Sequence, residues 1–187
     1  MTVIARRTLI TRATLSAAAV GFLGGTKLAF AAGSPTEGDL AILNVALGLE
    51  HEAIAAYQIG AESGLLKGGV LDTAVLFQSH HKTHRDAQIG AIKKLGGKPV
   101  EAKSADEYKK STKLAVASIK TAEDVLRLAQ RLELGAVNAY IGVMPSFADR
   151  SLSTVASKLL ADEVMHYTAL TSALNEALPK AGLSFGG

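Results

Sequence analysis

Apolar residues recur at alternating spacings of three and four along four stretches of the chain, which is the pattern of helices with one buried face. Ser34-Pro35-Thr36-Glu37 combines a capping residue, a proline at the first helical position and an acid three residues after the cap, so it opens a helix. Abundant alanine and leucine with no tryptophan also favour helices. The sequence predicts an all-α fold with helices at about 34–63, 71–94, 121–144 and 149–178.

The connections between these helices are short, long and short. Gly68-Gly69 marks the first loop and Pro145 ends the third helix. Residues 96–120 lie between the second and third helices, which is too many for a tight turn. Ser104 to Glu107 is expected to cap one short helical turn inside this segment. We therefore expect a four-helix bundle with a long crossover, in which the second and third helices run parallel.

Polar residues interrupt the apolar seam halfway along all four helices. They are Glu50 in the first helix, His81 and His84 in the second, Glu133 in the third, and Glu163 and His166 in the fourth. Each glutamate would be a carboxylate in a core, where an unpaired charge costs on the order of several kcal/mol. Six such residues at one level need a common partner, and a divalent cation is the simplest one.

An internal repeat relates the two halves of the chain. Leu49-Glu50, Ala53, Ala56 and Tyr57 recur as Leu132-Glu133, Ala136, Ala139 and Tyr140. The second helix of each half then carries an i, i+3 pair, His81 with His84 and Glu163 with His166. Two hairpins related by a pseudo-twofold axis would bring these two sets face to face.

Charge and cysteine usage limit the chemistry. The formal net charge is +3, but the first 31 residues contribute four basic residues and no acid, so the remainder carries −1. Nothing in this balance suggests binding to nucleic acid or to an anionic membrane. The absence of cysteine excludes disulfides, iron–sulfur clusters, thiolate zinc sites and a cysteine nucleophile.

Residues 1–31 have the order of an export signal. Arg6-Arg7 precede a weakly apolar stretch, and Ala29-Phe30-Ala31 offers a small-x-small cleavage site. The paired arginines resemble a bacterial twin-arginine signal, and an ordinary secretory signal is the alternative. The apolar run is shorter than the roughly 20 residues of a membrane span. We therefore expect a domain of residues 32–187 that is periplasmic or secreted and has no stable membrane anchor after cleavage.

Residues from about 38 to 178 resemble the ferritin-like superfamily, which includes bacterioferritins, rubrerythrins and exported ferritin-like domain proteins of bacteria. The resemblance implies a ferritin-like four-helix bundle. It also implies a di-iron or di-manganese centre, held by one glutamate from each of two helices and a Glu-x-x-His pair from each of the other two. The matching residues are Glu50, Glu133, Glu163, His166 and, as the second histidine, His84.

His81 departs from this family pattern, because it stands where the family has a carboxylate that bridges the two metals. The candidate site then has three carboxylates and three imidazoles. Iron or manganese, as one ion or two, is the expected cofactor. Zinc or copper is also possible, because imidazole nitrogens suit these metals.

Tyr57 and Tyr140 are candidates for quenching radicals beside the metal, since each follows a ligand glutamate by seven residues. The alternative is a core tyrosine with a hydrogen-bonded hydroxyl. His80 lies one position off the seam and, like Asp162, is expected at the surface, although a small rotation of the second helix would exchange His80 for His81.

Three classes of function remain open. The first is a redox enzyme that activates O2 or peroxide, as the resemblance implies for ferroxidases, peroxidases and manganese catalases. The second is a metal-binding or stress-protection protein without turnover, and the third is a bundle whose former site is now structural or an interaction surface. Metal ions are the expected partners, and a homodimer is compatible with the sequence.

Overall fold

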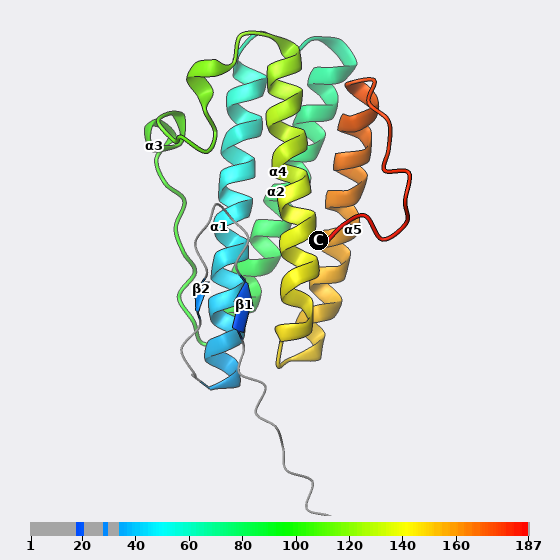
Figure 1. The fold of residues 1–187 in the computed structure, drawn as a ribbon. Coiled ribbons are helices and arrows are strands. Elements are labelled where there is room, and N and C mark those ends of the chain that lie inside the picture. The colour runs from blue at the N-terminus through cyan, green and yellow to red at the C-terminus, as the bar shows by residue number, and fades with distance from the viewer. Residues whose placement is uncertain (1–17, 21–27, 30–33, 187) are drawn as a thin grey trace, which may run out of the picture.

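A computed structural model describes residues 18–20, 28–29 and 34–186 of the chain. Its four long helices form a bundle (Figure 1): α1 (Pro35–Glu62), α2 (Gly68–Lys94), α4 (Ala122–Val143) and α5 (Arg150–Ala173). The connections contain the short helix α3 (Ala105–Lys109) and the 3-10 turns η1 (Val116–Ser118) and η2 (Met144–Ser146). The strands β1 (Ala18–Val20) and β2 (Leu28–Ala29) pair antiparallel, with Ala18 opposite Ala29. Arg6, Arg7 and the expected cleavage site at Ala31 lie outside the described residues.

The predicted caps open the helices. The Ser34 side chain accepts a hydrogen bond from the Glu37 backbone N–H, and the Glu37 carboxylate accepts one from the Ser34 backbone N–H. Thr121 with Asp124 makes the same reciprocal pair at the start of α4. Ser104 with Glu107 does so at α3, the short helical turn expected inside the crossover. Each pair satisfies two donors that a helix start leaves unpaired.

Helix α5 ends at Ala173, earlier than the boundary near 178 that its apolar pattern predicts. Asn175 adopts a left-handed conformation with φ of 55°. The backbone N–H of Glu176 then donates to the Thr171 carbonyl, and that of Asn175 donates to the Ser172 carbonyl. This is the Schellman arrangement that terminates helices, with asparagine in the position that glycine usually takes. Ala173, the last residue of the helix, is exposed.

The chain direction agrees with the expected topology. In Figure 1, α1 and α5 run upward while α2 and α4 run downward, and the green crossover returns along the outside of the bundle. Helix α1 packs along α2, and α4 packs along α5. The two hairpins meet where α1 contacts α4 and α2 contacts α5. The prediction of a four-helix bundle with a long crossover and parallel second and third long helices is confirmed.

The crossover is fixed to the bundle at both ends. At its start Gly96 adopts a φ of 78°, which ends α2, and a Cβ on Gly97 would overlap the Leu40 side chain. Further along, Tyr108 and Leu114 are buried against α1 and α4. The crossover therefore covers part of the face where these two helices meet.

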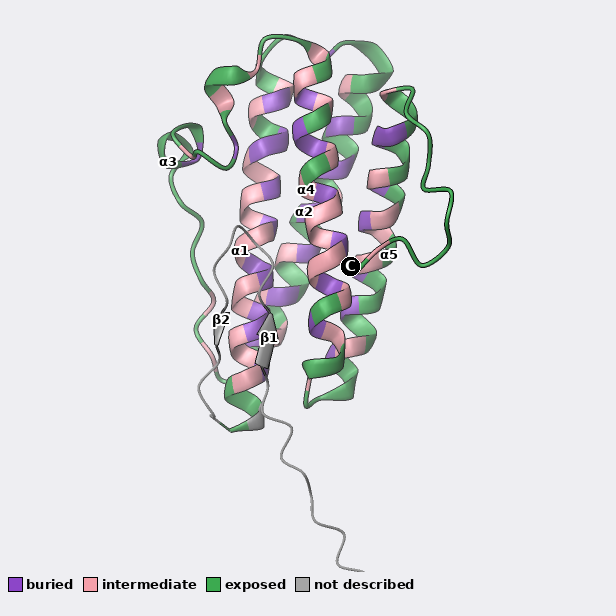
Figure 2. Ribbon diagram, viewed as in Figure 1, coloured by how far each residue is buried: buried purple, intermediate pink, exposed green. Residues whose placement is uncertain are grey.

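Residues coloured as buried recur along the length of all four long helices (Figure 2). At one end of the bundle the apolar core contains Tyr57, Phe77 and Leu170, and at the other it contains Leu47 and Ile92. Helix α1 is long and apolar enough from Thr36 to Glu62 to cross a membrane. Because α1 also packs on α2 and α4 and buries Glu50, the same composition fits a core helix.

Candidate metal centre

All six polar seam residues converge between the two apolar ends of the core, and none is more than 3% exposed. They fall into two groups of candidate ligands, within each of which the ligand atoms lie no more than 4.8 Å apart. One group is Glu50, His81, His84 and Glu163, and the other is His81, Glu133, Glu163 and His166. The two groups share His81 and Glu163, so the site has two halves with a common centre.

The two shared residues each direct one atom toward each half. Glu163 Oε1 lies 3.1 Å from His84 Nδ1, and its Oε2 lies 3.3 Å from His166 Nδ1. His81 Nδ1 lies 2.8 Å from Glu50 Oε2, and its Nε2 lies 3.2 Å from Glu133 Oε1. His81 on α2 and Glu163 on α5 therefore occupy equivalent places, as the sequence repeat pairs them.

The outward nitrogens of the other two histidines have partners that sequence reasoning assigned to the surface. His84 Nε2 lies 3.1 Å from Asp162 Oδ2, and His166 Nε2 lies 2.9 Å from His80 Nδ1. Asp162 is half exposed, but its carboxylate orients His84 so that Nδ1 faces the site. His80 stacks on His166 in the same role. His80 and Asp162 are thus partly exposed, in line with their predicted surface positions, but each also contacts a ligand histidine, which the sequence did not predict.

The two tyrosines reach across the pseudo-twofold axis. The Tyr57 hydroxyl donates to Glu133 Oε1, and the Tyr140 hydroxyl donates to Glu50 Oε1 at 2.6 Å. Each tyrosine thus contacts the glutamate of the other half of the repeat. Burial, followed by the nearby carboxylate charge, raises the pKa of both phenols well above the usual value, so both stay protonated.

Gln88 joins the Tyr140 side of this network, and the sequence analysis did not single it out. Its Nε2 donates to the Tyr140 hydroxyl at 2.6 Å and to Glu50 Oε1 at 3.2 Å. Gln88 falls one helical turn after His84 on the same buried face, and that spacing was the signal available in the sequence.

Three buried atoms at the centre of one half have no hydrogen-bond partner. They are Glu133 Oε2, Glu163 Oε2 and His166 Nδ1. His166 Nδ1 lies 3.5 Å from the Glu133 oxygen and 3.3 Å from the Glu163 oxygen. Buried polar atoms are almost always paired, so three that converge on one point fit a cation that all three would bind.

The electrostatics of the cluster are those of tightly paired opposite charges. Burial opposes ionisation of Glu50, but its hydrogen bonds to His81 and His84 outweigh burial and lower its pKa to about 2. Burial likewise opposes protonation of His84, yet hydrogen bonds to Glu163 and Glu50 raise its pKa to about 10. Glu163 is the exception, because burial raises its pKa. A metal ion must therefore displace protons from this site.

A pocket of about 790 Å³ opens between α1 and α4 and reaches the cluster. Glu50, His81 and Glu133 are among the residues that line it, and the basic residues Lys113 and Arg131 lie along the same wall. This pocket connects the otherwise buried ligands with the outside of the bundle.

Comparisons with known proteins agree with this architecture. Residues 38–176 match the sequence model of the ferritin-like domain. A conserved hypothetical protein from Mycobacterium tuberculosis is 25% identical, with 80% of this chain and 99% of that chain covered and a TM-score of 0.66. Dps from Thermosynechococcus elongatus is similar in fold, with 16% identity, 81% of this chain and 100% of that chain covered and a TM-score of 0.62. A comparison with curated proteins found no match.

Proposed function

The chain belongs to the ferritin-like family, and from this premise we propose that it binds a pair of divalent transition-metal ions at the six-residue cluster. The observation that carries the proposal is the convergence of Glu133 Oε2, Glu163 Oε2 and His166 Nδ1, three buried atoms without partners. One ion would take these atoms together with His81 Nε2. The second would take His84 Nδ1, Glu50 and the other oxygen of Glu163, with His81 Nδ1 beside them.

The donor set favours iron or manganese. Carboxylate oxygens suit manganese and iron, while imidazole nitrogens suit iron, zinc and copper, so iron satisfies both kinds of ligand. Three carboxylates neutralise less of the charge of two divalent ions than four would. We therefore expect unequal occupancy of the two positions.

The pair of tyrosines supports an oxidoreductase role with O2 or peroxide as the oxidant. Bound iron or manganese would supply the electrons for such a reaction. The hydroxyls of Tyr57 and Tyr140 each donate a hydrogen bond to a carboxylate oxygen of the site, and their raised pKa values keep the phenols neutral. An oxidant formed from O2 or peroxide at the site could take one electron from the phenol beside it while the phenol proton passes to the carboxylate that it faces, and this would spare the neighbouring core side chains from oxidation.

A non-catalytic bundle is the second candidate, and a specific observation favours it. The three carboxylates face three histidines, and hydrogen bonds to those carboxylates raise the histidine pKa values in spite of burial. The charges of the cluster therefore nearly balance without a metal. In that case the same residues would form a buried ion-pair network that fixes the register of the helices.

Elemental analysis of natively expressed protein, purified without oxygen, separates these functions. We expect between one and two iron or manganese ions per chain, and loss of most of this metal in Glu163→Ala. Asp72→Ala removes an exposed acid on α2 outside the cluster and serves as the control. Metal-free protein that also fails to bind added iron, manganese or zinc would refute metal binding. Metal-loaded protein that consumes neither O2 nor peroxide would leave the non-catalytic metal-binding role.

Export of the protein across the membrane is a separate proposal, because it rests on residues 1–31 alone. We propose that Arg6 and Arg7 direct twin-arginine translocation of the folded protein and that cleavage follows Ala31. Replacing both arginines by lysine should block export. Intact Met1 on most of the protein recovered from the cell envelope would contradict cleavage, and unimpaired export of the lysine variant would indicate the general secretory route.

A further inference from the structure

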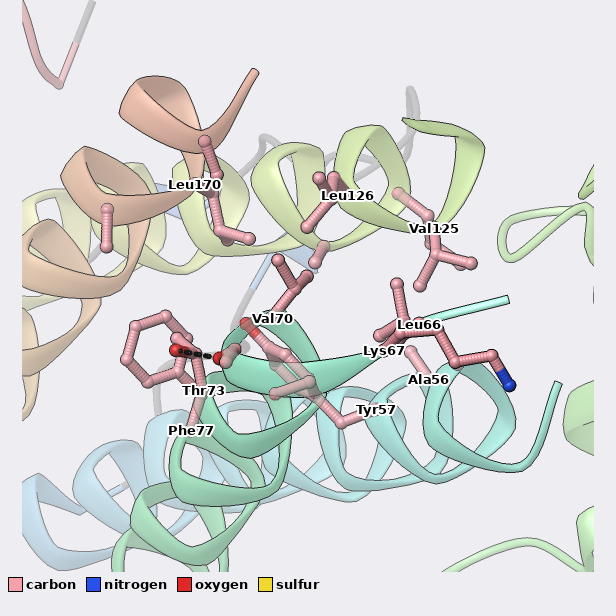
Figure 3. Close-up of a pocket in the computed structure, with 17 residues that line it drawn as sticks. Ala56, Tyr57, Leu66, Lys67, Val70, Thr73, Phe77, Val125, Leu126 and Leu170 are labelled. Atoms are coloured by element: carbon pink, nitrogen blue, oxygen red, sulfur yellow. Dashed lines mark hydrogen bonds between the residues drawn. The ribbon is translucent and has the colours of Figure 1, made fainter. Parts of the chain in front are cut away.

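A second pocket, of about 410 Å³, lies at the end of the bundle where α1 meets the loop to α2 (Figure 3). Its volume is in the range of roughly 300–1,000 Å³ that is typical of small-molecule sites. Alanine or glycine from all four long helices lines it, which is why the side chains leave space there. These residues are Ala56, Gly60, Gly69, Ala74, Ala129, Ala169 and Ala173. None of the six candidate metal ligands lines this pocket.

Two aromatic rings separate the pocket from the metal cluster. Phe77 stacks on His166 with ring centroids 4.1 Å apart, and the Tyr57 hydroxyl donates to Glu133. Both side chains line the pocket. A molecule in the pocket therefore reaches the outer side of residues that touch the candidate metal ligands.

The polar groups of the pocket indicate what it can hold. The hydroxyl of Thr73 donates to the Gly69 carbonyl, and that of Tyr57 donates to Glu133, so both donors are already used. The remaining polar side chain is that of Lys67, which is exposed and forms no ion pair with any carboxylate of the described residues. In Figure 3 the Lys67 ammonium group lies at the edge of the pocket away from Phe77. One end of the pocket thus suits hydrocarbon and the other suits an anion.

We propose that this pocket binds an alkyl carboxylate, with its chain against Tyr57 and Phe77 and its carboxylate at Lys67. Apolar walls account for affinity by removing hydrocarbon from water. The exposed ammonium group adds a smaller, salt-dependent preference for an anionic head. The binding does not require metal in the cluster, so it is independent of the proposed function.

Calorimetric titration of the metal-free full-length protein with decanoate and with decanol tests this proposal. Ala74→Leu fills the pocket, and Val70→Glu puts a charge at a position that is 40% exposed and tolerant of polar groups. Both variants should weaken decanoate binding at least about tenfold, since Ala74→Leu fills the apolar space and Val70→Glu puts a charge against the hydrocarbon chain. Ala87→Leu and Val155→Glu make the same changes at exposed positions of α2 and α5 outside the pocket, and they should bind as the unmodified protein does.

Lys67→Gln tests the head group. It should weaken decanoate binding by about two- to fivefold, as expected for an exposed ion pair, and leave decanol binding unchanged. Lys158→Gln, at an exposed position of α5, is the matched control. No decanoate binding, or pocket variants that bind as tightly as their controls, would overturn the proposal. Equal binding of decanoate and decanol that Lys67→Gln does not alter would overturn its carboxylate part. Because all titrations use metal-free protein, failure of metal binding leaves these results intact.

Discussion

His81 and Glu163 occupy equivalent places in the two halves of the site but differ in charge. Each directs one atom toward each group of ligands. A carboxylate with two oxygens can bind two cations while it stays a single anion, whereas a neutral imidazole has one lone pair to offer. His81 therefore serves one metal position well and leaves the other with fewer ligands.

Replacing His81 by glutamate should equalise the two metal positions. In the unmodified protein we expect one tight and one weaker ion, and in His81→Glu we expect the weaker one to bind at least about tenfold more tightly, which is about 1.4 kcal/mol. Calorimetric titration with manganese and zinc, checked by elemental analysis, measures this. His81→Gln introduces a polar side chain of similar length to glutamate but without its negative charge, so it should not tighten binding of the weaker ion. Two equally tight ions in the unmodified protein would show that His81 is no handicap.

At the scale of secondary-structure elements, Asp39 ties α1 to the turn between α4 and α5. Its side chain is buried, and its two oxygens accept the backbone N–H groups of Ala148 and Asp149 at 2.8 and 3.0 Å. Asp149 in turn caps α5. One carboxylate in the first helix thus positions the start of the helix that carries Glu163 and His166.

Asp39→Ala should lower the free energy of unfolding by about 2–3 kcal/mol, because it leaves two backbone donors without their charged acceptor. Asp39→Asn keeps one acceptor oxygen and should lower it less. Urea denaturation monitored by circular dichroism measures both changes, with Asp72→Ala as the exposed control on α2. An unfolding midpoint for Asp39→Ala equal to that of the control would contradict this role.

The helices were predictable to the extent that local chemistry sets their ends. The pairs Ser34–Glu37 and Thr121–Asp124 start α1 and α4 where the sequence predicts, since a cap acts within one turn. Helix α2 begins at Gly68 instead of near 71. Two glycines there cost about 1 kcal/mol each relative to alanine, and the packing of the bundle outweighs that local preference.

The candidate ligands were also predictable from local sequence pattern, but His80 and Asp162, the residues that contact the ligand histidines from outside the cluster, were not. Helical periodicity alone puts Glu50, His84 and the other seam residues on one face, and the repeat shows that the faces match. His80 and Asp162 lie off the seam and reach across to histidines of the neighbouring helix. Those contacts depend on the distance and angle between α2 and α5, and the periodicity of a single helix gives no information about either.

At the scale of the whole molecule, the stability of the bundle and the binding of metal depend on the same protons. In the metal-free protein, the histidines are held protonated by the glutamates that face them. Metal binding needs neutral imidazoles. As pH rises, the metal-free form should therefore lose stability, and the stabilisation that metal adds should grow.

The pKa of His84 is raised from 6.5 to about 10, so its contribution to folding is complete below pH 6.5 and is lost as pH rises toward 10. The pKa of Glu50 is lowered from 4.5 to about 2, so its contribution is complete above pH 4.5 and is lost as pH falls toward 2. For these groups the metal-free protein is most stable between pH 4.5 and 6.5.

We expect the melting temperature of metal-free protein to fall between pH 6.5 and 9, where each histidine protonated only in the folded state contributes a slope of about 1.4 kcal/mol per pH unit. Added zinc, which has no redox chemistry, should raise the melting temperature by an amount that grows over the same range, because fewer protons compete for the ligands. Thermal denaturation with and without zinc measures both trends. His51→Gln, which removes a histidine outside the cluster, should leave them unchanged. A zinc-induced shift that stays constant or shrinks as pH rises would mean that metal does not replace these protons.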